Sequence, residues 1–253
     1  MSIESRLAAL GATTLPQGIS EGVALGTGLA DGYDLFDSVL GPVVVTYNPS
    51  GVSSVDLADE GFEDRFLTRF ARPLLRAQAP TAWGKHIPEA IEAGRPHRIP
   101  VDLTSVTPFQ AEVLRTTATI PKGEVRPYAW LAREVERPNA VRAAGSAVAR
   151  NPIPLIIPCH RVVRSDGHIG NYSLGGAHNK HELLEHEGAS PDWLEDLASH
   201  HVRVRGNTST HIYCHPTCRA IRRSRDANVV DFAGADEAQA AGYRPCEICR
   251  PRP

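Results

Sequence analysis

Short apolar runs separated by turn residues occupy the first hundred positions of the chain. Three of these runs have the β-branched and aromatic character of strands: residues 33–38, 42–47 and 52–58. A Gly-Pro pair at 41–42 and the turn sequence Asn-Pro-Ser-Gly at 48–51 separate them. The pattern therefore predicts an antiparallel meander.

Helical spacing appears next, in two short segments. Phe62, Phe66, Leu67 and Phe70 recur on one helical face before Pro73, and residues 87–94 predict a second helix that ends at Gly94. Strands and helices that follow one another in this way indicate an α+β fold. We predict an N-terminal antiparallel-sheet subdomain at residues 1–104, in which no candidate chemistry is apparent.

From Thr107 onward the periodicity is that of short helices. A helix capped by Thr107 is predicted to end near residues 121–123, and two brief helices follow within 127–138 and 139–152. The second of these is rich in alanine and glycine, so it can approach another molecule closely. A helix pair joined by a tight turn is typical of helix-turn-helix proteins, although most such pairs are merely packed.

The remaining elements surround a single cysteine and lead to a separate C-terminal part. An apolar run at 153–158 precedes Cys159, an Asp-Gly turn at 166–167 predicts a hairpin within 161–170, and residues 175–188 predict a helix. We assign residues 105–190 to a helical subdomain with the helix-turn-helix. The acidic, turn-prone stretch 191–201 is predicted to link it to a small α+β domain at 202–253.

Composition gives a first view of the partner and the compartment. The net charge is −2 over 253 residues, but residues 101–165 and 200–253 each carry +4. Residues 1–100 carry a net charge of −4 and residues 166–199 a net charge of −6, and these acidic segments mask the two basic ones in the total. No secretion signal and no apolar run of the roughly eighteen residues of a membrane span is found. We expect a cytoplasmic monomer that does not contact a membrane, in which clustered cysteines indicate metal or chemistry.

Cys159 is the only cysteine outside the C-terminal part. A lone cysteine after an apolar run is more often a small core residue than a nucleophile. His160 follows it directly, and adjacent side chains in extended backbone point to opposite faces, so a direct thiol–imidazole pair is not expected. A proton can pass from Cys159 to His160 only through a water molecule or where the chain bends.

The sequence around Cys159 carries a specific resemblance. The run 151–163, with Pro-Cys-His-Arg-Val at its centre, is followed by Gly-Asn-Tyr-Ser at 170–173 and Leu-Leu-Glu-His-Glu-Gly at 183–188. Residues 123–128 and 139–145 match upstream in the same order. This part of the chain, from about Phe109 to Gly188, resembles the O6-alkylguanine-DNA alkyltransferases (methylated-DNA–protein-cysteine methyltransferases).

The resemblance implies a methylated-DNA–protein-cysteine S-methyltransferase that acts once per molecule in DNA repair. Cys159 accepts the methyl or larger alkyl group from guanine O6, or from thymine O4, because a soft thiolate suits displacement at carbon. His160 deprotonates the thiol through a water and Glu187 holds His160, while Tyr128 assists the leaving guanine and Asn151 fixes the loop. Without the resemblance, His160, Glu187 and Tyr128 would be interpreted as a core histidine, a solvated glutamate and an amphipathic helix residue.

The resemblance also implies how double-stranded DNA containing alkylated bases is bound. The target base must leave the stack, which costs roughly a few kcal/mol. Arg142 fills the vacated place, Ala143 and Gly145 allow the helix to approach the minor groove, and Tyr172 and Ser173 border the flipped base. The alternative function is a non-catalytic sensor of alkyl lesions with a structural zinc module; the presence of Cys159 argues against it.

Four cysteines near the C-terminus form two close pairs. Cys214 and Cys218 are separated from Cys246 and Cys249 by twenty-seven residues, a spacing typical of a four-thiolate zinc site. His211 or His215 could replace one ligand, and a redox role for the second pair is disfavoured by the first. No organic cofactor is expected.

This segment, from Tyr213 to Arg250, resembles the metal-binding domain of the Ada family. The resemblance implies that Cys214 is a zinc ligand and a second candidate acceptor, for methyl groups of DNA phosphotriesters. A purely structural zinc is the alternative. In the Ada family this domain precedes the alkyltransferase, and the regulatory helices between them have no counterpart here, so transcriptional activation is not expected.

Overall fold

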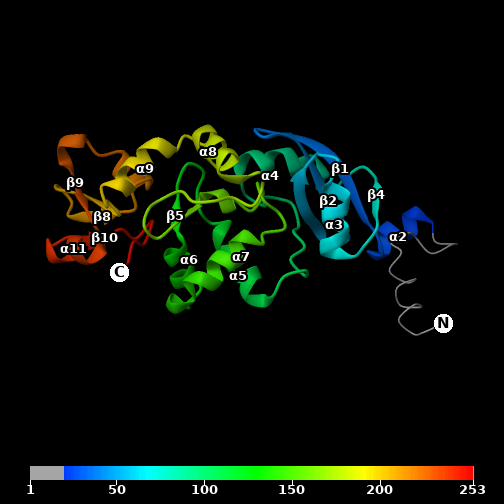
Figure 1. The fold of residues 1–253 in the computed structure, drawn as a ribbon, viewed down its shortest axis with the longest axis horizontal. Coiled ribbons are helices and arrows are strands. Elements are labelled where there is room, and N and C mark those ends of the chain that lie inside the picture. The colour runs from blue at the N-terminus through cyan, green and yellow to red at the C-terminus, as the bar shows by residue number, and fades with distance from the viewer. Residues whose placement is uncertain (1–19, 253) are drawn as a thin grey trace. The chain divides into compact units, whose positions relative to one another are not determined.

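The computed structural model describes residues 20–252 and divides the chain into two compact units (Figure 1). Of the described residues, the first unit contains 20–107 together with Pro152–Ile156, and the second contains Pro108–Asn151 and 157–252. The chain is therefore α+β, as predicted. The prediction that the N-terminus carries no secretion signal concerns residues that lie outside the described part of the chain.

A four-stranded sheet forms the centre of the first unit. Its strands are β1 (Asp31–Ser38), β2 (Gly41–Asn48), β3 (Gly51–Leu57) and β4 (Leu74–Arg76), in the order β3-β2-β1-β4. The predicted meander is confirmed, since β1 pairs antiparallel with β2 and β2 with β3. The first turn lies at residues 39–40 and not at the Gly-Pro pair, which begins β2.

The first unit also contains helices. They are α2 (Glu21–Thr27), α3 (Phe62–Phe70), the 3-10 turn Gly84–His86 and α4 (Ile87–Ala93). Gly94 ends α4 with a left-handed φ of 57°, which is the conformation that the predicted glycine stop requires. The carboxylate of Asp31 is fully buried; it accepts a hydrogen bond from the Ser53 hydroxyl at 2.5 Å and forms an ion pair with Arg72 at 2.8 Å.

The second unit begins with the predicted helices. They are α5 (Pro108–Thr117), α6 (Tyr128–Glu134), α7 (Val141–Ala149) and α8 (Gly176–His186), with the 3-10 turns Pro138–Ala140 and Cys159–Arg161 between them. Helices α6 and α7 pack together across the Pro138–Ala140 turn. Trp130 and Leu131 of α6 and Ala144 and Val148 of α7 are buried. This helix pair is the one that the sequence indicated.

The sequence predicted a β-hairpin within residues 161–170, and this prediction is wrong. Residues 164–168 do form a turn, in which Gly167 has a φ of 89° and donates to the carbonyl of Arg164 at 3.0 Å. Strand β6 (Val162–Val163), however, pairs in parallel with β5 (Arg126–Pro127). The Asp-Gly turn therefore closes a loop, and the strand partner of β6 is distant in the sequence.

The segment expected to be a linker contains helix α9 (Pro191–Ser199). The Ser190 hydroxyl accepts a hydrogen bond from the amide of Trp193 and caps the helix, with Pro191 at its first position. Leu194 and Leu197 are buried. Leu194 packs with Val125, Val163 and Leu184, so α9 is part of the core of the second unit.

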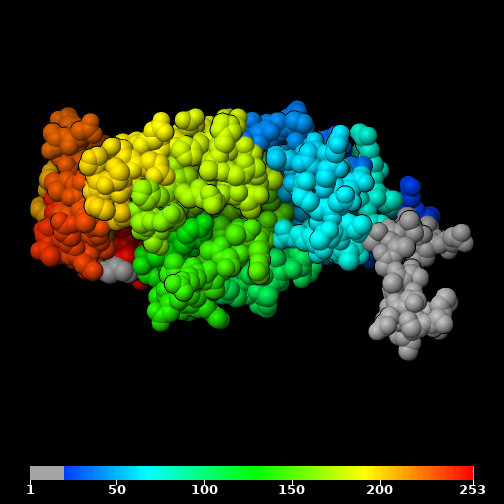
Figure 2. Space-filling model, in the orientation of Figure 1, coloured from blue at the N-terminus to red at the C-terminus, as the bar shows by residue number. Residues whose placement is uncertain are grey.

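The C-terminal module contains a second four-stranded sheet. Its strands are β7 (Val204–Asn207), β8 (Ile212–Cys214), β9 (Val229–Phe232) and β10 (Arg244–Pro245), in the order β10-β8-β7-β9. Helices α10 (Arg219–Arg222) and α11 (Ala235–Ala240), with the 3-10 turn Asp226–Asn228, complete it. Figure 2 shows this module, in orange and red, packed directly against the green and yellow part of the same unit. Within residues 20–252, no helix has the length and apolarity needed to cross a membrane.

Candidate active site and metal centre

Cys159 begins a 3-10 turn and its side chain is buried, with 3% of its surface exposed. The side-chain amide of Asn151 donates to its sulfur at 3.1 Å and to the carbonyl of Ile157 at 2.8 Å. Burial raises the pKa of the Cys159 thiol, while the Asn151 hydrogen bond and the charge of Lys180 lower it. The net effect is a raised pKa, so the resting thiol is protonated at neutral pH, and Asn151 and Lys180 stabilise the thiolate once a base has removed the proton.

His160 and Glu187 are in direct contact. The Nε2 atom of His160 lies 2.8 Å from a carboxylate oxygen of Glu187, which Arg161 also holds through its Nε and a terminal nitrogen at 2.7–3.1 Å. Although burial raises the pKa of Glu187, the hydrogen bonds from His160 and Arg161 lower it to about 2. Burial lowers the pKa of His160. The pair thus consists of an ionised carboxylate and a neutral imidazole at pH 7.

The second ring nitrogen of His160 is buried and has no partner among the described protein atoms. Since Nε2 is occupied by Glu187, Nδ1 is the nitrogen available to a water molecule or a proton. A relay of this kind is the one expected for adjacent side chains such as Cys159 and His160, which point to opposite faces of an extended chain. The geometry suits an imidazole that accepts a proton at Nδ1.

A cavity of about 260 Å³ opens onto Cys159. It is lined by Tyr128 from α6, by Val148 and Ala149 from α7, and by the loop residues Asn171, Tyr172 and Ser173. Burial, and then the charge of Cys159, raise the pKa values of both Tyr128 and Tyr172, so both phenols stay protonated at neutral pH. The predicted residues Tyr128, Tyr172 and Ser173 therefore share one cavity with the sulfur.

Helix α7 presents small residues and an arginine. Arg142 and Ala143 are exposed, and Gly145 faces Tyr128, whose ring would lie 3.8 Å from a Cβ at that position. Arg142 is not among the residues that line the Cys159 cavity. The helix thus places Arg142 on the surface, while its far end, at Val148 and Ala149, reaches the cavity.

The four C-terminal cysteines come together. The sulfur atoms of Cys214, Cys218, Cys246 and Cys249 all lie within 4.8 Å of one another and are buried. Tight backbone turns support these cysteines. The amide of Cys218 donates to the backbone carbonyl of His215 at 3.0 Å, and the amide of Arg250 donates to the backbone carbonyl of Cys246 at 2.9 Å. Neither His211 nor His215 belongs to the cluster, so the four-thiolate set is the one assembled.

The donor chemistry of this cluster fits zinc. Hydrogen bonds with Cys218 and Cys249, then burial, and then the charge of those neighbouring sulfurs raise the pKa of Cys214, so the four thiols cannot all ionise without a cation. A divalent cation removes this penalty, and a set of four cysteine thiolates is a typical structural zinc site. Zinc is therefore the cofactor of the C-terminal module, held by Cys214, Cys218, Cys246 and Cys249.

Two buried charges at the site were not predicted as functional. Arg161 holds Glu187, and its own side chain is 1% exposed. The ammonium of Lys180 donates to the carbonyls of Val162 and Ile169 at 2.6 and 2.7 Å, and burial lowers its pKa to about 8. Arg161 lies in the Pro-Cys-His-Arg-Val motif, so its place in the sequence could have indicated a role in the site. Nothing in the helical pattern marked Lys180.

Comparisons with known families agree with this arrangement. The family model described as "6-O-methylguanine DNA methyltransferase, DNA binding domain" matches residues 108–189. The model described as "Metal binding domain of Ada" matches residues 195–252. The first range contains Cys159 and its cavity, and the second contains all four clustered cysteines.

Individual relatives extend the match. The methylated-DNA–protein-cysteine methyltransferase of Mycobacterium leprae is 34% identical over 152 residues, which cover 60% of this chain and 88% of that protein. The bifunctional transcriptional activator/DNA repair enzyme Ada of Escherichia coli K12 is 34% identical over 175 residues, or 66% of this chain and 48% of that protein. The chain spans about half the length of several other curated relatives.

A solved structure is also similar. The crystal structure of Mycobacterium tuberculosis OGT in complex with DNA has a TM-score of 0.50 and 30% identity, covering 64% of this chain and 98% of that one. The fold and the buried cysteine site thus define a protein of the cysteine-acceptor alkyltransferase class. The chain belongs to the methylated-DNA–protein-cysteine methyltransferase family, and it carries an Ada-type metal-binding domain at its C-terminal end.

Proposed function

We propose that the protein repairs DNA by direct reversal of alkylation, with Cys159 as an irreversible acceptor for alkyl groups from guanine O6 or thymine O4. The observation that carries the proposal is the set of groups around the sulfur: the Asn151 amide at 3.1 Å, the cavity lined by Tyr128 and Tyr172, and the His160–Glu187 pair. Each of these serves a displacement at carbon.

The reaction moves one alkyl group and one proton. His160, through a water at Nδ1, takes the proton of the Cys159 thiol, and Glu187 stabilises the imidazolium that results. The thiolate attacks the alkyl carbon, so the sulfur–carbon bond forms as the carbon–O6 bond breaks. The Tyr128 hydroxyl donates a hydrogen bond to the departing guanine anion, which takes up one proton as it leaves, and this balances the proton that His160 removed from the thiol. A thioether remains on Cys159, so each chain reacts once.

Helix α7 is the proposed contact with double-stranded DNA. Its exposed Arg142 would occupy the place of the extruded nucleotide, and Ala143 and Gly145 would let the helix enter the minor groove. Tyr172 and Ser173 would border the base once it lies in the cavity. The alternative, a sensor that only binds lesions, makes no use of the hydrogen bond between Asn151 and the sulfur.

Stoichiometry tests this proposal. Limiting protein is incubated with an excess of duplex containing O6-methylguanine, and the demethylated guanine is counted. We expect one guanine restored per chain with no turnover, and none with Cys159→Ser. Binding of the duplex without any loss of methyl groups would instead establish a sensor.

We propose a second acceptor, Cys214, for methyl groups of DNA phosphotriesters. Cys214 and Cys246 line a cavity of about 300 Å³, and Arg219, Arg222, Arg223 and Arg225 lie exposed in the segment that follows Cys218. Bound zinc would keep the Cys214 sulfur ionised. Transfer breaks the methyl–oxygen bond, forms a thioether on Cys214 and releases a phosphodiester anion, which the arginines would hold.

A duplex carrying methylphosphotriesters but no alkylated base isolates this activity. Methyl on the peptide that contains Cys214, retained in Cys159→Ser, is the expected result. If zinc is bound but Cys214 stays unmodified, the metal is structural only.

The remaining proposals concern context. Both acceptors need reduced thiols, which suits the cytoplasm, and we propose that the protein acts there as a monomer without a membrane partner. We also propose the boundaries 1–104, 105–190 and 202–253 for its domains, with 191–201 as the junction that contains α9.

A further inference from the structure

One short segment of the second unit lies between the two cysteine sites. It runs from Gly123 to Pro127, ends in strand β5, and leads directly into Tyr128. Glu124, Val125 and Arg126 are all buried in it. None of these three residues has a role in the proposed chemistry, so their burial and charge need another explanation.

On one side this segment contacts the Cys159 site. The amide of Gly123 donates to the Glu187 carboxylate at 3.2 Å, and so joins His160 and Arg161 in holding it. The approach is close, because a Cβ on Gly123 would lie 2.6 Å from the Glu187 carbonyl oxygen. Strand β5 also pairs with β6, which begins three residues after Cys159.

On its other side the same segment contacts the first cysteine pair. The hydroxyl of Thr217, which lies between Cys214 and Cys218, accepts from the Val125 amide at 2.8 Å. The Glu124 carboxylate accepts from the Arg219 amide, directly after Cys218, at 3.1 Å and also pairs with Arg126. Thr217 and Glu124 are 2% and 1% exposed, so these bonds are shielded from water.

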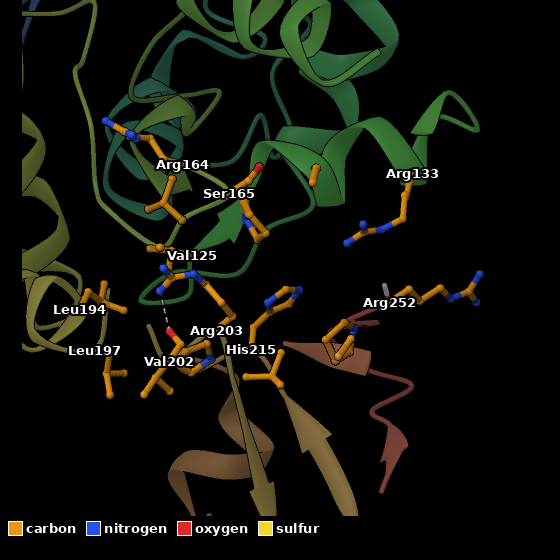
Figure 3. A pocket seen from close by; sticks show the side chains of 18 residues that line it. Val125, Arg133, Arg164, Ser165, Leu194, Leu197, Val202, Arg203, His215 and Arg252 are labelled. Atoms are coloured by element: carbon orange, nitrogen blue, oxygen red, sulfur yellow. Dashed lines mark hydrogen bonds between the residues drawn. The ribbon is translucent and has the colours of Figure 1, made fainter. Parts of the chain in front are cut away.

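The junction is continuous around these bonds. Figure 3 shows Val125 and His215 at the same cavity, which measures about 220 Å³ and is lined by residues of both parts. On the surface, Arg250, directly after Cys249, pairs with Glu134 of α6. Thus each cysteine pair is followed by a contact with the alkyltransferase part.

We propose that Thr217 and Glu124 are positioning residues through which the four-cysteine module sets the reactivity of Cys159. Through the Gly123–Pro127 segment, a well-ordered cysteine pair fixes the Gly123 amide against Glu187, and thereby fixes His160. Loss of this support would loosen the carboxylate and slow deprotonation of the thiol. Because coupling between two sites is reciprocal, a change at the cysteine cluster alters the reactivity of Cys159, and a change at Cys159 alters the cysteine cluster. The inference rests on the proposed role of His160 and Glu187.

Thr217 offers a matched pair of variants. Thr217→Val keeps the shape but removes the acceptor for the Val125 amide, whereas Thr217→Ser keeps the hydroxyl. The full-length proteins, with zinc content measured, are treated with iodoacetamide across a pH series, and alkylation is quantified on the Cys159 peptide. The groups that titrate or carry charge around the sulfur are Tyr128, His160, Arg161, Tyr172, Lys180 and Glu187. All of them are unchanged in both variants.

We expect Thr217→Val to alkylate at Cys159 about fivefold more slowly at neutral pH with a displaced pH profile, and Thr217→Ser to restore both. Amide hydrogen exchange at Gly123 and Val125 should be faster in Thr217→Val. Zinc-depleted wild-type protein, which loses every contact of the module, should alkylate at Cys159 at least as slowly as Thr217→Val and recover on reloading, so the proposal stays testable if Thr217→Val loses its metal.

Wild-type alkylation rates and profiles in both Thr217→Val and the zinc-depleted protein would overturn the proposal. This result is separable from failure of the proposed function, because iodoacetamide reports on the Cys159 thiol whether or not a methylated duplex is repaired.

Discussion

The side-chain amide of Asn151 donates a hydrogen bond to the sulfur of Cys159 at 3.1 Å while a second bond from the same amide holds the carbonyl of Ile157. One side chain thus fixes the loop before the cysteine and stabilises its thiolate. It is one of the groups that oppose the rise in the Cys159 pKa caused by burial.

Replacement of Asn151 by alanine should therefore slow transfer without abolishing it. Hydrogen bonds to charged groups contribute about 1.5–3 kcal/mol, so we expect a rate about tenfold to a hundredfold lower. Single-turnover kinetics with a methylated duplex measure this. Asn179→Ala is the control, because Asn179 lies in the same unit and its side-chain amide donates to the carbonyl of Leu174 and not to Cys159. Equal rates for wild type and Asn151→Ala would remove Asn151 from the site.

Glu187→Gln should reduce the transfer rate by about tenfold or more, because a neutral amide stabilises the His160 imidazolium less than a carboxylate does. Glu185→Gln, an exposed position on the same helix, is the matched control and should react like wild type. Rapid-quench kinetics distinguish the two. If both variants reacted alike, the His160–Glu187 contact would be structural only.

The same carboxylate makes stability depend on pH. The pKa of Glu187 is depressed from its ordinary 4.5 to about 2, so its contribution is fully present above pH 4.5 and is lost as pH falls toward 2. Linkage gives about 3 kcal/mol for this difference. Urea unfolding of wild type should lose that much more free energy than Glu187→Gln between pH 5 and 2. Parallel curves for the two proteins would contradict the assignment.

Arg142→Ala should weaken repair of duplex DNA selectively. Arg142 is exposed on α7 and does not line the Cys159 cavity, so its loss should affect extrusion of the base and not transfer itself. We expect slower reaction with a methylated duplex and an unchanged rate with free O6-methylguanine. A similar loss with both substrates would place Arg142 in the chemistry.

Removal of zinc should unfold the C-terminal module, whose small core depends on the metal. One zinc per chain is expected by elemental analysis, with loss in Cys249→Ser and retention in Cys159→Ser. Retention of zinc in Cys249→Ser together with an unchanged melting curve would argue against a four-thiolate site.

Local patterns predicted much of the fold. Strands β1–β3 and helix α4 were found because alternation, turn residues and a glycine stop all agreed. Strand β4 has only three residues, too few to show a period, and it pairs in parallel with β1. The hairpin at 161–170 failed because β6 pairs with a distant strand, which no local signal reveals. Ser190 and Pro191 are a helix-start signal for α9, but acidic, turn-prone residues surround them, and this composition favours a turn over a helix.

In the functional site, too, local sequence signals were predictive and tertiary contacts were not. Cys159 and the four clustered cysteines were predicted from motif and spacing, and the structure brings each set together. Lys180 and Glu124 could not be predicted, since a single charge on a helix or in a turn is usually solvated, and their burial arises only from tertiary packing.

The central claim is that Cys159 carries the alkyl group after repair. The most direct measurement is peptide mass mapping of the full-length protein after reaction with a duplex containing O6-methylguanine. A single methyl group on the Cys159 peptide, absent from Cys159→Ser, is the result predicted. An unmodified Cys159 peptide, in protein that has removed the methyl group from the duplex, would contradict the account.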